Sequence, residues 1–104
     1  MERVLIDSFV VPEESRDAFL EQVRQTQGYI KTLPGFIEGY VYENRDGVGR
    51  FNFLTIAVWK DEAALENAKQ AVATENQKRG IKPREVIRQL GVESTRALYE
   101  RSPY

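Results

Sequence analysis

The stretch LPGFIEGYVYENRDGVGRFNFLTIAVWKD, residues 33–61, contains two β-type runs between a helix end and a helix start. Leu33-Pro34-Gly35-Phe36 ends a preceding helical pattern, because proline and glycine both interrupt helices. Residues 36–44 and 50–59 then have the pattern of two strands, and the glycines between them suit a hairpin with positive φ angles. Val58-Trp59-Lys60-Asp61 closes the second strand, and its aspartate is a suitable N-cap for a helix. The stretch predicts a central β-hairpin with a helix on either side.

The residues outside this stretch complete a regular order of elements. Residues 4–11 alternate with a period of two, which is typical of a strand. Between Pro12 and Leu33 apolar side chains recur at intervals of three and four, the stripe of an amphipathic helix. A short helix over 84–90 and a strand over 94–100 follow the second long helix. The order β-α-β-β-α-β predicts an α+β, ferredoxin-like fold, in which an antiparallel sheet carries its helices on one face.

Length and charge restrict the class of protein. We expect one domain over residues 1–104, because this length leaves little room for a second core. With 15 basic and 16 acidic side chains the net charge is −1, so no nucleic-acid partner is expected. No apolar run approaches the roughly 20 residues that span a bilayer, so no membrane partner is expected. The N-terminus enters a strand pattern without the apolar region of a signal peptide, which favours a cytoplasmic location.

The chain contains neither cysteine nor histidine. Disulfides, thiolate nucleophiles, zinc ribbons and iron–sulfur ligation are therefore excluded. Ser-His-Asp triads and imidazole ligands for metals or haem are excluded as well. Because there is also no glycine-rich phosphate loop, we expect no metal site and no cofactor. Any chemistry must come from carboxylates, aromatic side chains, cations, amides, hydroxyls or the substrate itself.

Both faces of the predicted sheet are apolar, although the helices cover only one. The face away from the helices would carry six large aliphatic side chains: Val4, Ile6, Val10, Leu54, Ile56 and Val58. Burying each of them contributes about 1.5–3 kcal/mol. We therefore predict a homodimer in which the two sheets pack face to face. By the same alternation, Arg96 is expected at the dimer interface or its rim.

The Leu-Pro-Gly-Phe turn and the Val-Trp-Lys-Asp step resemble the antibiotic biosynthesis monooxygenase family over residues 4–99. The resemblance implies a dimeric α+β barrel. It also implies cofactor-independent oxidation of electron-rich aromatic molecules, in which the substrate's own enolate or phenolate reduces dioxygen. Trp59 is similar to the polyketide-oxidising branch, whereas Thr55 stands where that branch has an asparagine. The haem-degrading branch is set aside, because Asp7, Ala68 and Lys78 occupy the places of its asparagine, tryptophan and axial histidine.

Three residues are candidates for catalysis. Asp7 lies in mid-strand on the side that faces the helices, and a buried carboxylate needs a partner or a raised pKa. It is either paired with a cation at the sheet end or a general base for a phenol-like substrate. Trp59 either closes the core under a helix or contacts substrate. Thr55 can form a hydrogen bond to a substrate oxygen.

Four residues are candidates for substrate binding. Phe9 and Phe53 should point from the sheet into a pocket below the helices. The second helix has an inner stripe that is mostly alanine, with Ala68 at its centre, and this predicts either a thin roof over an aromatic-lined pocket or close packing. Tyr40 would orient a polar ring if its face looks at the helices; otherwise it is an interface or surface aromatic.

One basic stretch, Lys78-Arg79-Gly80-Ile81-Lys82-Pro83-Arg84, has two interpretations. It is either a solvated loop beyond a helix C-terminus, where cations suit the helix dipole, or an anion-binding segment. Taken together, the sequence favours a cofactor-independent monooxygenase-like enzyme for a hydrophobic, oxygenated small molecule, aromatic or quinol-like. The alternative is a non-catalytic small-molecule-binding or stress-response dimer on the same scaffold.

Overall fold

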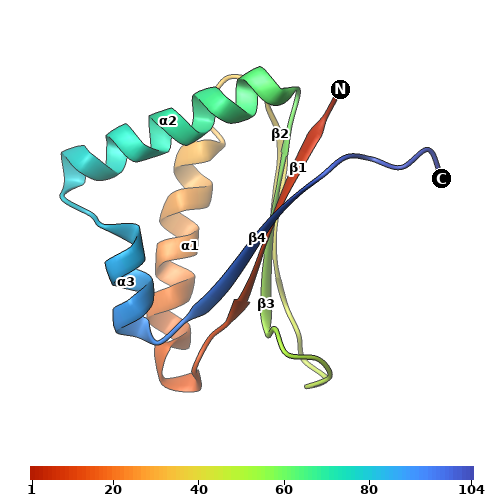
Figure 1. The fold of residues 1–104 in the computed structure, drawn as a ribbon. Helices are drawn as coiled ribbons and strands as arrows, with labels where there is room; N and C mark the ends of the chain where they lie inside the picture. The colour runs from red at the N-terminus through yellow and green to blue at the C-terminus, as the bar shows by residue number, and fades with distance from the viewer.

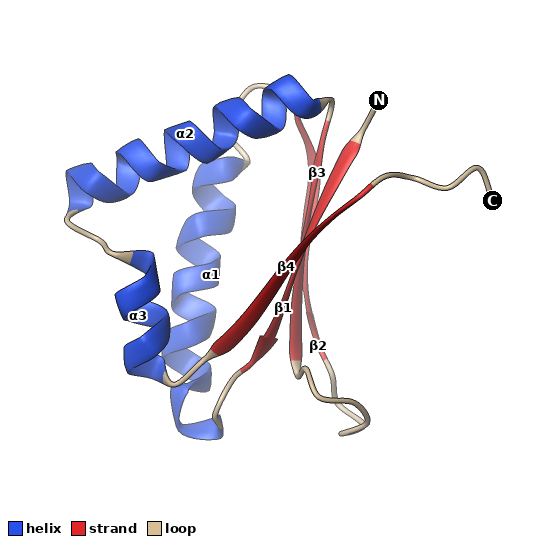
Figure 2. Cartoon of the chain, in the orientation of Figure 1, coloured by secondary structure: helices blue, strands red, loops and turns tan.

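Four strands form one antiparallel sheet in the order β2-β3-β1-β4 in the computed structural model, which describes all 104 residues. The strands are β1 Arg3–Val10, β2 Phe36–Glu43, β3 Phe53–Trp59 and β4 Glu93–Tyr99. The helices are α1 Arg16–Ile30, preceded by the 3-10 turn η1 Glu13–Ser15, α2 Glu62–Arg79 and α3 Pro83–Leu90. All of the helices lie on one side of the sheet (Figure 1, Figure 2). The predicted ferredoxin-like fold is confirmed.

The turn between α1 and β2 brings the chain close to the start of α2. Gly35 has a φ of +81°, and a Cβ atom at this position would lie 2.4 Å from the Cβ of Ala64. Only glycine permits both this backbone angle and this approach. On the other side of the contact, the carboxylate of Asp61 accepts a hydrogen bond from the Ala64 backbone N–H at 2.8 Å, which caps α2 as predicted.

β3 begins at Phe53, three residues later than the sequence pattern indicates. Asn52, just before β3, still bonds through its backbone to both neighbouring strands, and its side chain bonds to the backbone just beyond the end of β1. Its Oδ1 accepts a hydrogen bond from the N–H of Val11 at 2.8 Å, and its Nδ2 donates to the carbonyl of Val11 at 2.9 Å. A side-chain amide therefore continues the pairing of β1 with this segment after the regular ladder has ended.

The core between helices and sheet consists of two apolar clusters. One contains Phe9 and Phe19, whose ring centroids are 4.9 Å apart in an edge-on arrangement. The other contains Trp59 and Leu65, and the ring of Phe36 stands edge-on to the indole at 5.4 Å. Such aromatic pairs add about 0.5–1.5 kcal/mol to the contribution of the buried area.

An ion pair joins the start of α1 to the end of β2. The guanidinium of Arg16 donates to both carboxylate oxygens of Glu43, at 2.9 and 2.7 Å. These hydrogen bonds hold the pKa of the Glu43 carboxyl below its usual range. The same guanidinium lies 6.0 Å from the ring centroid of Phe53, so it also covers one edge of the core.

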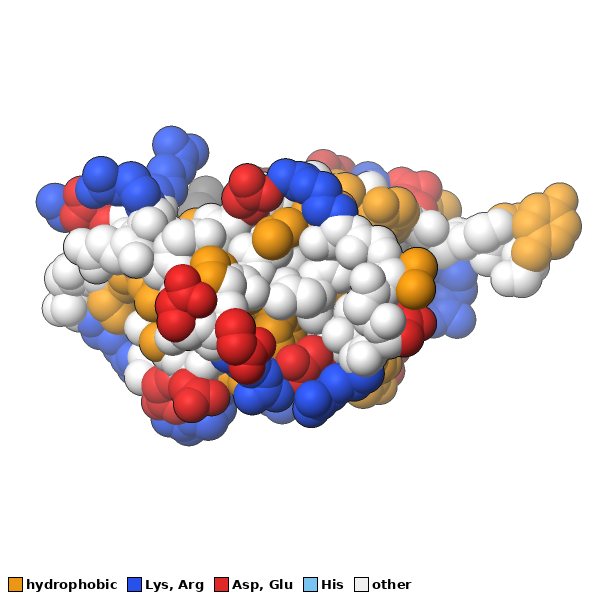
Figure 3. Space-filling view, turned by 90° about the horizontal axis from the view of Figure 1, so that it is seen from below, with side chains coloured by type: hydrophobic (Ala, Val, Ile, Leu, Met, Phe, Trp, Pro, Cys, Tyr) orange, Lys and Arg blue, Asp and Glu red, His pale blue; other side chains and the backbone are white.

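The face of the sheet away from the helices is open in the single chain. Large aromatic side chains are exposed there, with Tyr40 at 45%, Tyr42 at 52% and Tyr99 at 52% exposure. Over the end of the molecule seen from below, acidic and basic side chains are interspersed (Figure 3). None of the helices combines the length and the apolar character needed to cross a membrane.

Candidate functional site

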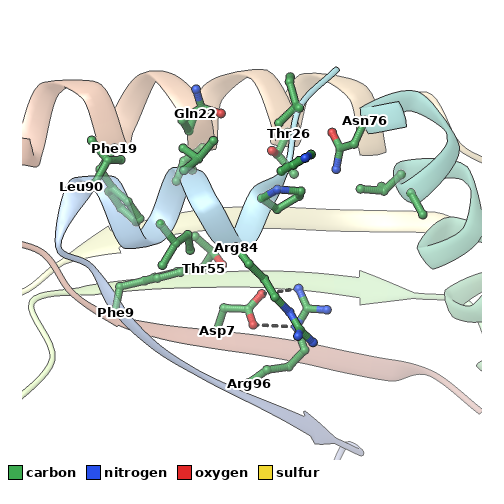
Figure 4. A pocket seen from close by; sticks show the side chains of 18 of the residues that line it. Asp7, Phe9, Phe19, Gln22, Thr26, Thr55, Asn76, Arg84, Leu90 and Arg96 are labelled. Atoms are coloured by element: carbon green, nitrogen blue, oxygen red, sulfur yellow. Dashed lines mark hydrogen bonds and ion pairs between the residues drawn. The ribbon is translucent and has the colours of Figure 1, made fainter. Parts of the chain in front are cut away.

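A cavity of about 740 Å³ lies between the sheet and a layer formed by α1, α3 and the C-terminal half of α2. Small-molecule sites typically occupy about 300–1,000 Å³. The apolar part of its lining includes Phe9, Phe19, Val23, Val72, Ile87 and Leu90. Figure 4 shows Phe9, Phe19 and Leu90 at one end of this cavity and Asn76 at the other. Its size and lining suit a hydrophobic molecule with a few polar groups.

The cavity opens because α2 leaves the sheet. Near its start this helix is close to β3, where Leu65 and Ala68 are 1% and 3% exposed. Towards its end α2 runs away from the sheet, and α3 turns back below it (Figure 1). Of the two interpretations of the alanine stripe around Ala68, close packing therefore holds, and the stripe forms no roof over the cavity. The roof is formed by other residues of α2, most of them further along the helix: Lys69, Val72, Ala73, Asn76 and Gln77.

Asp7 lines the cavity and is bound to a cation on the neighbouring strand. It is the register partner of Arg96 on β4. The Nε of Arg96 donates to Oδ1 at 2.8 Å and the Nη2 donates to Oδ2 at 3.2 Å. The carboxylate side chain is 18% exposed and the arginine side chain 60%. The expected pairing of Asp7 with a cation is present, and both residues of the pair line the cavity.

Thr55 lies beside Asp7 on the other neighbouring strand. The two residues are register partners between β1 and β3, and both line the cavity. A hydroxyl, a carboxylate and a guanidinium thus stand in a row across three strands, from Thr55 through Asp7 to Arg96. This row forms the polar floor of an otherwise largely apolar cavity (Figure 4).

Three predicted site residues lie in the core instead of in the cavity lining. Trp59 is 2% exposed, Phe53 3% and Ala68 3%, and none of them lines the cavity. The indole N–H of Trp59 is buried without a hydrogen-bond partner. Val72 packs against the cluster that contains Trp59 and also lines the cavity. Of the two interpretations of Trp59, closing the core under a helix therefore holds, and Phe9 is the predicted aromatic that does line the cavity.

Tyr40 lies on the opposite face of the sheet, which corrects its placement among the pocket residues. It pairs with Ile56, and its hydroxyl donates to Glu38 at 2.8 Å, which raises the pKa of Tyr40 above its usual value. The cause is a β-bulge between Phe36 and Glu38. Because the extra residue reverses the alternation, Phe36 faces the helices while Tyr40 faces away.

The profile of the antibiotic biosynthesis monooxygenase family matches residues 3–77 of this chain. The chain belongs to this family. The match covers β1 through most of α2, including Asp7, Thr55 and the first part of the cavity roof. It ends before residues 81–90 and before β4, which supply the remaining cavity lining.

Solved structures of several proteins share the fold of this family member. A proposed monooxygenase from Shewanella loihica is 21% identical with a TM-score of 0.76, covering 99% of this chain and 96% of that one. SnoaB, a cofactor-independent oxygenase from Streptomyces nogalater, is 22% identical with a TM-score of 0.73, covering 99% and 95%. A heme-degrading protein from Mycobacterium tuberculosis is 16% identical with a TM-score of 0.58, covering 66% and 78%. No curated protein matches the sequence significantly.

Sequence reasoning did not predict where the cations of the cavity lie. Arg96 was expected at a dimer interface or rim, but β4 places it on the helix side beside Asp7. The sequence did contain a signal for a cation at this place, because the inward-facing carboxylate of Asp7 on β1 requires a cation nearby. Arg84 belongs to the basic stretch noted above, and it too lines the cavity. Its position depends on where α3 lies, which the sequence pattern does not indicate.

Proposed function

We propose that this member of the family is a cytoplasmic, homodimeric, cofactor-independent monooxygenase that acts on a hydrophobic, oxygenated aromatic molecule. One observation carries the proposal. The cavity has the size of a small-molecule site, and its only carboxylate, Asp7, lies between a hydroxyl and a guanidinium. A base and hydrogen-bond donors at the floor of an apolar cavity are what such a reaction requires from the protein.

In the proposed reaction, Asp7 removes a proton from an activated methylene group of the phenolic substrate. The substrate anion is then oxidised by dioxygen, which is the only co-reactant. A carbon–oxygen bond forms, the oxygen–oxygen bond breaks, and the methylene becomes a ketone. The second oxygen atom leaves as water together with the two methylene hydrogens. Thr55 donates a hydrogen bond to a substrate oxygen, and Arg96 positions the Asp7 carboxylate.

The proposed dimer rests on the open face of the sheet. Apolar side chains of β1 and β3 lie on this face beside Tyr40, Tyr42 and Tyr99. An exposed apolar surface of this kind is typical of protein–protein contacts. Packing two copies face to face would bury it while leaving the cavity, on the other side of the sheet, accessible.

Oxygen uptake with dithranol tests the reaction. Dithranol is a dihydroxylated tricyclic ketone with a reactive methylene group, and its spontaneous oxidation is subtracted with a protein-free control. We expect the wild-type protein to accelerate uptake and Asp7→Asn to lower the rate at least about tenfold with little change in binding, because the amide keeps the shape but not the base. Asp46→Asn, in the exposed hairpin loop, is the control and should keep the wild-type rate. An undiminished rate in Asp7→Asn would remove Asp7 as the base.

A second candidate function is a non-catalytic small-molecule-binding or stress-response dimer. The observation that favours it is the burial of Trp59 in the core, since this leaves the cavity without the aromatic that resembles the polyketide-oxidising branch. The same experiment separates the two functions. A binding protein would bind dithranol without raising the rate of oxygen uptake. The binding would be seen as quenching of the protein's fluorescence.

A further inference from the structure

The side chains that line the cavity carry more positive than negative charge. Four cationic residues line it, Lys69, Lys82, Arg84 and Arg96, whereas Asp7 is the single carboxylate. The whole chain, in contrast, has a net charge of −1. The excess of positive charge is therefore local to this cavity. Cations around an apolar hollow focus their field into it and attract anions.

Two of the four cations already have carboxylate partners. Arg96 is bound to Asp7, and the Nζ of Lys69 lies 3.3 Å from Glu66. Lys82 and Arg84 take part in none of the ion pairs of the structure, and Arg88 occupies the nearest carboxylate on the same helix, Glu85, at 3.3 Å. These two exposed cations at the start of α3 thus form no ion pair within the protein.

Arg84 extends towards the polar floor of the cavity. Its side chain reaches from α3 towards Asp7 and Arg96 (Figure 4). Both oxygens of Asp7 accept hydrogen bonds from Arg96, so the carboxylate is already engaged. A second guanidinium beside this pair raises the local positive charge further. An anionic group from outside the chain would offset it.

The cations and the apolar wall lie within reach of one small molecule. Lys82 and Arg84 flank Pro83 at the first turn of α3, and Ile87 and Leu90 of the same helix line the apolar part. Phe9 and Phe19 continue that part towards the far end (Figure 4). A ligand with an apolar body and one anionic group fits this division of the cavity.

We propose that the ligand is an aromatic carboxylate whose rings contact the apolar wall and whose carboxylate is bound by Lys82 and Arg84. This inference rests on the proposed function in one respect, that this cavity holds the substrate. A guanidinium matches the planar carboxylate with two parallel donors, and an ammonium adds a point charge. The substrate of the oxidation therefore carries its carboxylate on a part of the molecule other than the reacting carbon. The basic stretch from Lys78 to Arg84 contributes its last two cations to this site.

Naphthoate and naphthamide provide the test, because they share a shape and differ in charge. Their affinities for the full-length protein are measured by equilibrium fluorescence at low and high ionic strength. We expect wild type to bind naphthoate about tenfold more tightly than naphthamide, and high salt to weaken the binding of naphthoate alone. The variant Lys82→Gln/Arg84→Gln should bind both molecules equally. Arg88→Gln, one turn further along α3 and outside the cavity lining, is the matched control and should keep the preference.

Three results would overturn the inference: equal affinities in wild type, a preference that survives in the double variant, or no binding of either molecule. Thermal unfolding of each variant verifies that its fold is intact. Because binding is measured without turnover, the two proposals fail separately. Oxygen uptake that depends on Asp7, with no preference for naphthoate, would leave the reaction standing and remove the anion site. A clear preference for naphthoate without oxygen uptake would leave the anion site standing and remove the reaction.

Discussion

Asp7 and Arg96 face each other across β1 and β4, and the carboxylate of one accepts two hydrogen bonds from the guanidinium of the other, at 2.8 and 3.2 Å. Because 18% of the Asp7 side chain and 60% of the Arg96 side chain are exposed, this pair is neither buried nor fully solvated. A pair of this kind orients a carboxylate more than it stabilises a fold. In the proposed reaction, this pair orients the carboxylate towards a substrate in the cavity.

Removal of the guanidinium should affect reactivity more than stability. We expect Arg96→Gln to lower the free energy of unfolding by about 1 kcal/mol or less, as is typical of exposed ion pairs. The rate of oxygen uptake should fall, because the two hydrogen bonds that hold the Asp7 carboxylate in place are then lost. A double-mutant cycle with Asp7→Asn, measured by urea unfolding, isolates the coupling between the two residues. A loss of several kcal/mol would mean that the pair is chiefly structural.

Substitutions at two alanines of α2 should distinguish the cavity from the core. Ala73 lines the cavity, so Ala73→Phe should fill it and abolish the binding of aromatic ligands with little effect on stability. Ala68 is 3% exposed in the core, so Ala68→Phe should lower the free energy of unfolding by about 1–3 kcal/mol through overpacking. Ala63→Phe, on an exposed part of the same helix, is the control for the added ring. Ligand titration and thermal unfolding of all three variants provide the comparison.

The turn at Gly35 should be far more sensitive than the hairpin turn at Gly47. Both glycines have positive φ angles, 81° and 75°, so an alanine costs backbone energy of about 1–2 kcal/mol at either position. At Gly35 the new methyl group would also lie 2.4 Å from the Cβ of Ala64, whereas nothing lies within 4 Å at Gly47. Gly35→Ala should therefore cost about 1–3 kcal/mol more than Gly47→Ala in urea unfolding. Equal losses would show that α2 shifts away freely.

The open sheet face should determine the oligomeric state. Light scattering is expected to give about twice the chain mass of 12.0 kDa. Ile56→Asp should produce monomers, because an unpaired charge would lie in the contact between the two sheets. Val48→Asp, on the hairpin loop where the side chain is 72% exposed, should remain dimeric. A folded wild-type monomer at micromolar concentration would contradict the dimer.

The ion pair between Arg16 and Glu43 predicts a dependence of stability on pH. Hydrogen bonds from Arg16 lower the pKa of the folded Glu43 carboxyl below the usual value of a free glutamate. The stabilisation is therefore fully present above that value and is lost as the pH falls through the lowered pKa. Glu43→Gln should be less stable than wild type at neutral pH and approach wild type in acid. Glu14→Gln, an exposed carboxylate outside any ion pair, should show no such convergence when melting temperatures are compared across the pH range.

The sequence by itself determined the order of elements and the inner faces of two strands. The turn at Leu33–Phe36, the glycines of the hairpin and the Asp61 cap are local signals, and each acts within a few residues. The period of two along β1 and β3 placed Asp7, Phe9 and Thr55 towards the helices, where the structure has them. Such features follow from short-range sterics and hydrogen bonding, so they can be predicted without knowing the fold.

Only the tertiary structure decided which of these residues share a cavity. A single β-bulge in β2 turned Tyr40 to the face away from the helices. No local sequence pattern predicts the extra residue that forms this bulge. The register of β4 on β1 brought Arg96 to Asp7 across 89 positions of the chain. The close approach of the start of α2 to the sheet sealed Trp59 and Ala68 in the core, and the departure of its later turns opened the space that α3 and Arg84 complete. Registers and helix directions depend on packing between distant segments, which the periodicity of one segment does not contain.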